Sequence, residues 1–336
     1  MKKSYYLLTF MILGFFLGAE NTVHSDTMFN DEADPIDATR ITFLPTSLSS
    51  KVRVSSKSFY DNNVVISQKA MTSSKIGDYR NAVQAQNPMT MYKGFQELAS
   101  GVGLIYEQPE FRTNEPCYLS FNGQRETIQL TYNNIGTYEL LKSDGTTSKK
   151  RAGVRVTLSN IIVGAGPKWT NDKTKRPWIE CSNYFSDGIL YGNIKKMDAD
   201  FVFYDSVSGK KLNFIPSSHA FLPFSSLNAY PNASLVEDTE KKGRHEFAGP
   251  DNLTLVRHIK VSQNSLISYH SKASSPEEAY DQYTFYAEKA IEGIDFTDYM
   301  AGKTFNRSSV QFPLYGIKNS FKFGSTYGRG WTSFSN

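Results

Sequence analysis

The sequence predicts a mostly β protein, built as an antiparallel β-sandwich with one appended α-helix. Apolar and polar residues alternate along short segments, as in "DADFVFYDSVSGKKLNF" at 198–214, where Ala199, Phe201 and Phe203 point to one side. Turns rich in Gly, Asn and Ser separate these segments, and alternation resumed after a polar turn is typical of a hairpin. No strand–helix–strand rhythm appears, which argues against a doubly wound parallel sheet.

The first residues predict export. Lys2 and Lys3 precede an uncharged, largely apolar run over 5–19, and Val23 and Ser25 suit the −3 and −1 positions of a cleavage site. This pattern indicates a secretory signal peptide over 1–25, because the apolar run is short for a membrane-spanning helix. An uncleaved anchor helix is the alternative. We therefore expect a secreted or cell-surface protein with no membrane span after cleavage.

Three segments follow the signal peptide. Residues 26–39 are acidic and polar and predict a disordered leader. Residues 40–115 give weak signals, which indicate an N-terminal segment of mixed short elements. Residues 116–336 carry a steady β pattern and predict the sandwich domain. The 20 Tyr and 23 Phe residues of the chain suit strands.

The strands of 116–336 are expected where period-two alternation is clearest. They are, in chain order, CYLSFNGQ (117–124), ETIQLTY (126–132), AGVRVTL (152–158), the hairpin at 198–214, NLTLVRHIKV (252–261), VQFPLYGI (310–317) and FKFGS (321–325). In the hairpin, Asp205, Ser206 and Gly209 are the residue types that build a turn. We expect this hairpin to be a central pair of strands and thus part of the scaffold.

One helix is predicted near 276–292. Ser275 suits the N-cap, Pro276 the first helical position, and Glu278 completes a capping box. Gly293 is a natural stop. We expect this helix to lie over the end of the sandwich.

The charge balance argues against a nucleic-acid partner. Signal removal takes away two Lys and one Glu, so the formal net charge falls from +4 to +3. Nucleic-acid binding needs a clustered basic face, which a nearly neutral chain of this length does not indicate. The basic runs at 148–151 and 173–177 are typical of solvated turns.

Two cysteines, Cys117 and Cys181, are present. If they pair, they close a loop of about 64 residues, nominally worth about 4 kcal/mol in the chain-entropy model. The alternative is two buried, inert thiols, since bulky residues flank both positions. Two cysteines do not suffice for a disulfide-framework fold or a four-cysteine zinc site.

Catalytic motifs are missing from the sequence. No nucleophile elbow, H-E-x-x-H helix, Walker loop or dinucleotide fingerprint occurs. The five histidines show no spacing typical of a metal pair. Glycosidase chemistry needs two carboxylates at a separation that sequence does not reveal. We predict that the protein is not an enzyme and uses no cofactor, and the sequence leaves a metal site open.

Motifs between 131 and 236 resemble a known family. They are N-x-G-x-Y (Asn134, Gly136, Tyr138), V-x-V-T (Val154, Val156, Thr157), F-x-F-Y-D-x-x-S-G-K (Phe201, Phe203, Tyr204, Asp205, Ser208, Gly209, Lys210) and F-x-x-L-N (Phe224, Leu227, Asn228). This pattern resembles adhesin-type β-sandwich domains of Gram-positive bacterial cell-surface proteins, of the CshA type or of the glucan-binding protein C and antigen I/II type. The match covers about a third of the chain firmly.

The resemblance implies a function outside the cell. It implies a surface adhesin domain, active in virulence, that binds a host or community ligand noncovalently as a monomer; the ligand class is a glycan or a matrix protein. A secreted hydrolase on the same scaffold and a structural stalk module of a cell-wall protein are the alternatives. No L-P-x-T-G sorting signal occurs, so we expect either the N-terminal part of a longer wall-anchored protein or a secreted one.

The candidate ligand-binding residues are Trp169, Trp178, Tyr184 and Asp187. The two tryptophans flank the polar stretch "TNDKTKRP". Aromatic rings beside hydrogen-bonding groups suit sugar faces or peptide side chains. We expect these rings to line the binding surface, with Asp187 and the charged loop 231–252 at its rim. Alternatively, both tryptophans close the end of the sandwich core.

Overall fold

The computed structural model describes residues 30–44, 52–56, 65–67, 117–120, 126–142, 144–164, 177–181, 184–192, 194–216, 218–227, 246–251, 258–270, 284–287, 305–326 and 328–335. Strands account for 66% of the described residues and helical turns for 5%. The prediction of a mostly β, antiparallel protein is therefore confirmed. Among the described residues no helix is long and apolar enough to cross a membrane.

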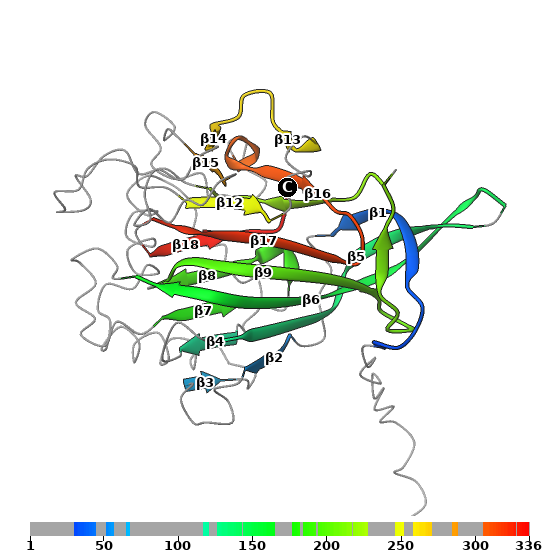
Figure 1. The fold of residues 1–336 in the computed structure, drawn as a ribbon, viewed down its shortest axis with the longest axis horizontal. Helices are drawn as coiled ribbons and strands as arrows, with labels where there is room; N and C mark the ends of the chain where they lie inside the picture. The colour runs from blue at the N-terminus through cyan, green and yellow to red at the C-terminus, as the bar shows by residue number, and fades with distance from the viewer. Residues whose placement is uncertain are drawn as a thin grey trace, which may run out of the picture.

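The first layer is a ten-stranded sheet (Figure 1). Its strands follow the order β10-β1-β5-β6-β9-β17-β12-β15-β14, and β2 pairs with β5 beside β1. Their bounds are β1 (Ile36–Phe43), β2 (Arg53–Ser56), β5 (Ile128–Leu141), β6 (Thr147–Val163), β9 (Ile194–Asp205), β10 (Leu212–Phe214), β12 (Glu246–Pro250), β14 (Ile267–His270), β15 (Thr284–Ala287) and β17 (Lys318–Ser325). The long hairpin β5–β6 projects beyond the other strands at one side of the molecule (Figure 1).

The second layer consists of two smaller sheets. They have the orders β18-β8-β7-β4-β3 and β11-β16-β13. Their strands are β3 (Val65–Ser67), β4 (Cys117–Ser120), β7 (Trp178–Cys181), β8 (Ile189–Gly192), β11 (Phe221–Phe224), β13 (Lys260–Val261), β16 (Val310–Pro313) and β18 (Arg329–Thr332). An isolated bridge between Ser225 and Ser333, with two backbone hydrogen bonds of 2.9 and 3.2 Å, joins the two sheets. The 3-10 turns η2 (Phe185–Asp187) and η5 (Phe305–Ser308) belong to this layer's connections.

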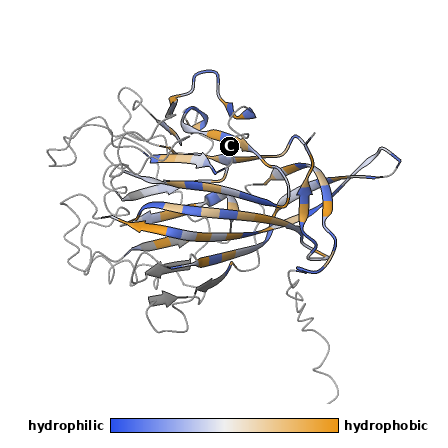
Figure 2. Ribbon diagram, viewed as in Figure 1, coloured by the Kyte–Doolittle hydropathy of each residue, from blue (hydrophilic) through white to orange (hydrophobic). Residues whose placement is uncertain are grey.

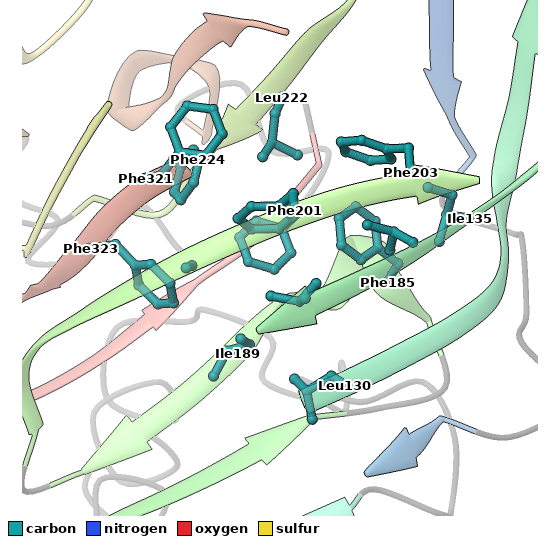
Figure 3. Packing of buried hydrophobic residues seen from close by; sticks show 14 of the residues in the cluster. Leu130, Ile135, Phe185, Ile189, Phe201, Phe203, Leu222, Phe224, Phe321 and Phe323 are labelled. Carbon is teal, nitrogen blue, oxygen red and sulfur yellow. The ribbon is translucent and has the colours of Figure 1, made fainter. Parts of the chain in front are cut away.

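Aromatic rings fill the space between the layers (Figure 3). Phe201 of β9 lies at the centre, and it is fully buried. Its ring centroid lies within 6.4 Å of the rings of Phe185, Phe203, Phe224, Phe321 and Phe334. These rings come from β9, β11, β17, η2 and the segment after β18. The core therefore ties both layers together, and burial of its apolar area stabilises the fold at about 25 cal/mol per Å².

The alternation predicted for 198–214 is confirmed on β9. Ala199, Phe201 and Phe203 are fully buried, whereas Val202 is half-buried on the other face. Hydrophobic and hydrophilic residues alternate along the strands of this sheet (Figure 2). Tyr204 also points outward, yet it is only 2% exposed because its ring lies over Gly153, where a Cβ would collide with it.

The Tyr204 hydroxyl donates to the backbone oxygen of Tyr132 at 2.8 Å. Burial raises the pKa of Tyr204 to about 12, although nearby Arg53 and Arg155 lower it. The phenol therefore stays neutral and keeps this hydrogen bond at physiological pH.

Asp205 organises the turn after β9. Its Oδ1 accepts hydrogen bonds from the Ser208 backbone N–H at 2.7 Å, the Ser208 hydroxyl at 2.8 Å and the Val207 N–H at 3.2 Å. Its Oδ2 accepts from the Tyr138 hydroxyl at 2.8 Å. Gly209 closes the turn with a φ of 72°, a value that favours glycine. The turn built by Asp205, Ser206 and Gly209 is thus confirmed.

Asp205 makes the stability of the protein pH-dependent. Burial alone would raise the pKa of its carboxyl, but the hydrogen bonds from Ser208, Tyr138 and Val207 lower it below its usual value. The stabilisation is complete above the unfolded pKa of about 3.9 and is lost as pH falls through the lower folded pKa. We expect Asp205→Asn to lower the free energy of unfolding by about 1–3 kcal/mol at pH 7.

Urea denaturation at pH 7 and pH 3 measures this effect. The gap between the wild type and Asp205→Asn should narrow at pH 3, because the Asp205 carboxyl of the unfolded wild-type chain binds a proton below its pKa of about 3.9. Asp31→Asn is the control, since Asp31 is exposed and forms a surface ion pair with Lys211 at 2.9 Å. A gap that is equal at both pH values would contradict the role of Asp205.

The partner of the second hairpin strand differs from the prediction. After the turn, only Tyr204 and Lys211 form an antiparallel bridge. β10 instead pairs in parallel with β1, with Asp37 opposite Asn213. Phe214 is fully buried and packs against Phe203 at 5.5 Å between ring centroids. β9 is therefore central in the sheet as expected, whereas β10 is its edge strand.

The helix predicted at 276–292 is wrong for residues 284–287. These residues form β15, which pairs with β12 and β14. The local reason is that Thr284, Phe285 and Tyr286 favour strands, with Phe285 buried against the core. The rest of the range lies outside the described residues.

The segment boundaries near the amino terminus also shift. Residues 36–39, which we assigned to the leader, belong to β1, and Ala38 is fully buried in the core. In the segment 40–115, β2 pairs with β5 and β3 pairs with β4. The described parts of this segment are therefore strands of the sandwich itself.

Candidate ligand-binding end of the sandwich

One end of the sandwich contains Trp178, and we call it the Trp178 end. Trp178 begins β7 and lies opposite Gly192 of β8 and Ser120 of β4. Gly192 also lies opposite Arg329, the first residue of β18. β6 and β17 of the first layer end on this side, at the left of Figure 1. The Ile194 backbone N–H donates to the Gly328 oxygen at 3.0 Å, which joins the two layers there.

Several chain connections leave strands at the Trp178 end. Residues 165–176, which include Trp169, connect β6 to β7. Residues 121–125 connect β4 to β5, residues 228–245 lead into β12, and residues 288–304 follow β15. Both layers contribute to this set. In sandwich folds, loops that cluster at one end are where ligand contacts are made.

Trp169 lies outside the described residues, and for Trp178 the structure describes only the backbone. Tyr184 is half-buried and precedes η2. β7 rises by about 3.3 Å per residue, so Cys181 lies about 10 Å from Trp178 and Tyr184 follows it. The structure therefore places Tyr184 away from Trp178, at the opposite end of β7.

Asp187 is fully buried, so its side chain does not lie at an exposed rim. The backbone oxygens of η2 accept hydrogen bonds from the carboxyl-terminal segment. The Trp331 indole N–H donates to the Asp187 oxygen at 2.6 Å, and the Ser333 hydroxyl donates to the Ser186 oxygen at 2.7 Å. η2 therefore anchors β18 and the residue that follows it, which is a structural role.

Two buried residues near the Trp178 end were missed by sequence reasoning. Trp331 is 3% exposed and packs against Phe305, with 6.4 Å between ring centroids. Glu246 is fully buried at the start of β12, and its Oε1 accepts a hydrogen bond from the Trp331 backbone N–H at 3.1 Å. Trp331 and Phe334 are three residues apart, so the sequence shows no period-two alternation that could have indicated the burial of Trp331. No local signal distinguishes Glu246 from its charged neighbours in 231–245.

The predicted rim loop 231–252 is shorter than expected. Its residues 246–250 form β12, all of them buried, between β17 and β15. Residues 228–245 lie outside the described part of the chain. Only this portion of the predicted loop is left as a candidate for ligand contact at the Trp178 end.

The outer face of the first layer near this end carries paired charges. The Lys196 Nζ lies 3.9 Å from the Asp198 Oδ1, and the Asn160 side-chain amide donates a hydrogen bond to the Asp198 Oδ2 at 2.7 Å. Ile162 beside them is 43% exposed. Within the described ranges, no group of three or more His, Cys, Asp or Glu residues could hold a metal ion. The described groups on this face can therefore bind a ligand through surface contacts, both polar and apolar.

Cys117 and Cys181 are direct partners in the pairing of β4 with β7. Cys181 is fully buried in the core between the layers. Of the residues singled out from the sequence, the structure therefore places the two cysteines directly opposite each other on neighbouring strands.

Comparisons with known proteins give a likeness to solved structures alone. No protein-family model matches the chain, and no curated protein matches it. Among solved structures, the chain is similar to the adhesin domain of PrgB from Enterococcus faecalis, with 14% identity and a TM-score of 0.49 over 93% of this chain and 94% of that chain. That structure is described as an adhesin domain, and its description names neither the CshA kind nor the glucan-binding protein C and antigen I/II kind. A likeness at this level carries no information about ligand or partner.

Proposed function

We propose that this chain is the ligand-binding part of an exported surface adhesin of a Gram-positive bacterium. It binds a glycan or a matrix protein noncovalently, as a monomer, and attachment to a host contributes to virulence. The signal-peptide pattern over 1–25 supports export, and attachment to the cell wall through a further region is part of the proposal.

The observation that carries the proposal is that strands of both layers, β4 and β6 among them, end at the Trp178 end. Aromatic rings fill the interior between the layers, so a ligand is expected to bind on the surface and not between the sheets. Trp169 belongs to the connection 165–176 between β6 and β7, and we propose that it contributes to the binding surface together with Trp178. Tryptophan supplies a large contact area with few rotors to immobilise, which favours binding of sugars and peptide side chains.

A binding array tests the proposal. The chain lacking residues 1–25 is incubated with immobilised glycans and matrix proteins, and the recovered ligands are analysed for cleavage. Binding without turnover supports adhesion. Turnover of a bound glycan indicates a hydrolase instead, and an array without any binding indicates a stalk module, so either result overturns the proposal.

Single substitutions Trp169→Ala and Trp178→Ala locate the binding surface. Each should weaken binding of the array-selected ligand at least tenfold, about 1.4 kcal/mol, because a central aromatic contact is lost. Each should leave the melting temperature of the chain unchanged. Isothermal titration and thermal unfolding measure the two quantities.

Trp331→Ala is the matched control. Trp331 is buried, and its indole donates to Asp187, so its loss should lower the melting temperature while the folded fraction still binds. If Trp169→Ala and Trp178→Ala behave like Trp331→Ala, the two tryptophans close the core and the proposed surface is wrong.

A further inference from the structure

The register of β4 and β7 places Cys117 directly opposite Cys181. The same pairing sets Tyr118 opposite Glu180, Leu119 opposite Ile179 and Ser120 opposite Trp178, so no bulge displaces the cysteines. Directly opposite residues of an antiparallel pair share one face of the sheet, with Cα atoms about 4.5–5.5 Å apart. Disulfides join Cα atoms about 4.4–6.8 Å apart.

We propose that Cys117 and Cys181 form a cross-strand disulfide in the mature protein. The register gives the shared face and the range of Cα separation that a disulfide requires. Cys181 is a buried free thiol in the structure, so the proposed bond is the oxidised form of this pair. The chain has two cysteines, and they lie directly opposite each other. A register shift of one residue would put their side chains on opposite faces of the sheet, so chance alone would rarely give this placement.

The bond would close a covalent ring through both layers of the sandwich. The chain leaves the second layer after β4, forms β5 and β6 in the first layer, and returns to the second layer as β7. Residues 118–180 would therefore be held in a closed loop. β4 would stay attached to β7 even when the hydrogen bonds between them open, which also retains β3 at the edge of the sheet.

The chemistry is a two-electron oxidation. Two thiols lose two protons and two electrons, and one S–S bond forms. A protein or small-molecule disulfide accepts the electrons and is itself reduced to two thiols. Cys181 is fully buried in the folded chain, so the exchange is expected during folding, before the layers close over it. An oxidising compartment outside the cytoplasm is therefore required.

Mass spectrometry under denaturing, non-reducing conditions tests the bond. The chain is produced by secretion and treated with an alkylating agent before any reductant is added. We expect an intact mass lower by two hydrogen atoms than the thiol form, and no alkylated cysteine. Trypsin should release peptides 113–125 and 176–195 joined as one species, which separates after reduction.

The same chain made in a reducing cytoplasm is the control, and there both cysteines should be alkylated. Reduction of the secreted chain while unfolded, followed by refolding in reductant, should lower its melting temperature by about 5–10 °C. A secreted chain in which both cysteines are alkylated overturns the inference. The result is independent of the array, because a chain that binds no ligand can still contain the disulfide.

Discussion

Replacement of Phe201 by Ala should lower the free energy of unfolding by about 3–5 kcal/mol. Phe201 is fully buried, and its ring contacts rings from both layers, the nearest being that of Phe334 at 5.3 Å between centroids. The substitution removes buried apolar area and leaves a cavity. The long strands β6 and β17 on either side of β9 keep the surrounding structure from collapsing into it. Since native domains are stable by only about 5–15 kcal/mol, this loss approaches complete unfolding. Urea denaturation followed by far-ultraviolet circular dichroism measures it.

Val202→Ala is the matched control on the same strand. Val202 points away from the core and is half-buried, so we expect a loss of about 1 kcal/mol or less. Similar losses for the two variants would show that the interior between the layers is not the main source of stability.

Gly188→Ala should destabilise the protein by about 3–5 kcal/mol, or prevent recovery of folded chain. Gly188 follows η2 with φ 76° and ψ −144°, a region that only glycine adopts readily. A Cβ there would overlap the backbone oxygen of Thr332. That oxygen belongs to β18, so relief of the overlap requires the strand to move away from η2. Thermal and urea unfolding of the purified variant measure the loss.

Gly145→Ala separates the two causes of this loss. Gly145 has a similar φ of 79° at the tip of the β5–β6 hairpin, but a Cβ there would meet no atom within 4 Å. We expect it to cost about 1–2 kcal/mol, from backbone conformation alone. An equal cost at both glycines would contradict the close approach of Gly188 to β18.

Elements with a strong local pattern were predictable from sequence. The alternation of β9 and the turn residue types of Asp205 and Gly209 are local properties, and each was found as predicted. β12 was not predictable, because "EFAGP" shows no alternation and contains one β-former, Phe247, beside Gly249 and Pro250, which disfavour strands. It becomes a strand because β17 offers it five residues of pairing partners. Here tertiary pairing overrides local propensity.

The helix prediction failed for a related reason. Ser275, Pro276 and Glu278 form a valid start signal, but a capping box does not decide where a helix ends or whether one forms. At 284–287, pairing on both sides and burial of Phe285 favour a strand. The pairing of β10 with β1 instead of with β9 was likewise not predictable. Asn213 of β10 and Asp37 of β1 are 176 residues apart, and no local sequence signal indicates so distant a partner.

The ligand-binding role of the candidate residues stays a prediction. The sequence indicated a polar loop between Trp169 and Trp178, and β6 and β7 border the connection 165–176 that contains this loop. It did not indicate that Tyr184 and Asp187 belong to a separate turn at the other end of β7. Spacing along the chain does not reveal which end of a strand a residue occupies until the strand limits are known. The opposition of Cys117 and Cys181 depends in the same way on register.

The parallel pairing of β1 with β10 has a consequence for the order of folding. β1 is made early, whereas residues 212–214 of its partner follow after most of the first layer. While the chain emerges amino terminus first, one edge of β1 has no strand to bind until that point. Such long sequence separation makes folding slow, and an open strand edge can pair with other chains. Partly emerged chains are therefore the species most exposed to aggregation, and a factor that shields β1 until residues 212–214 have emerged would increase the yield of folded protein.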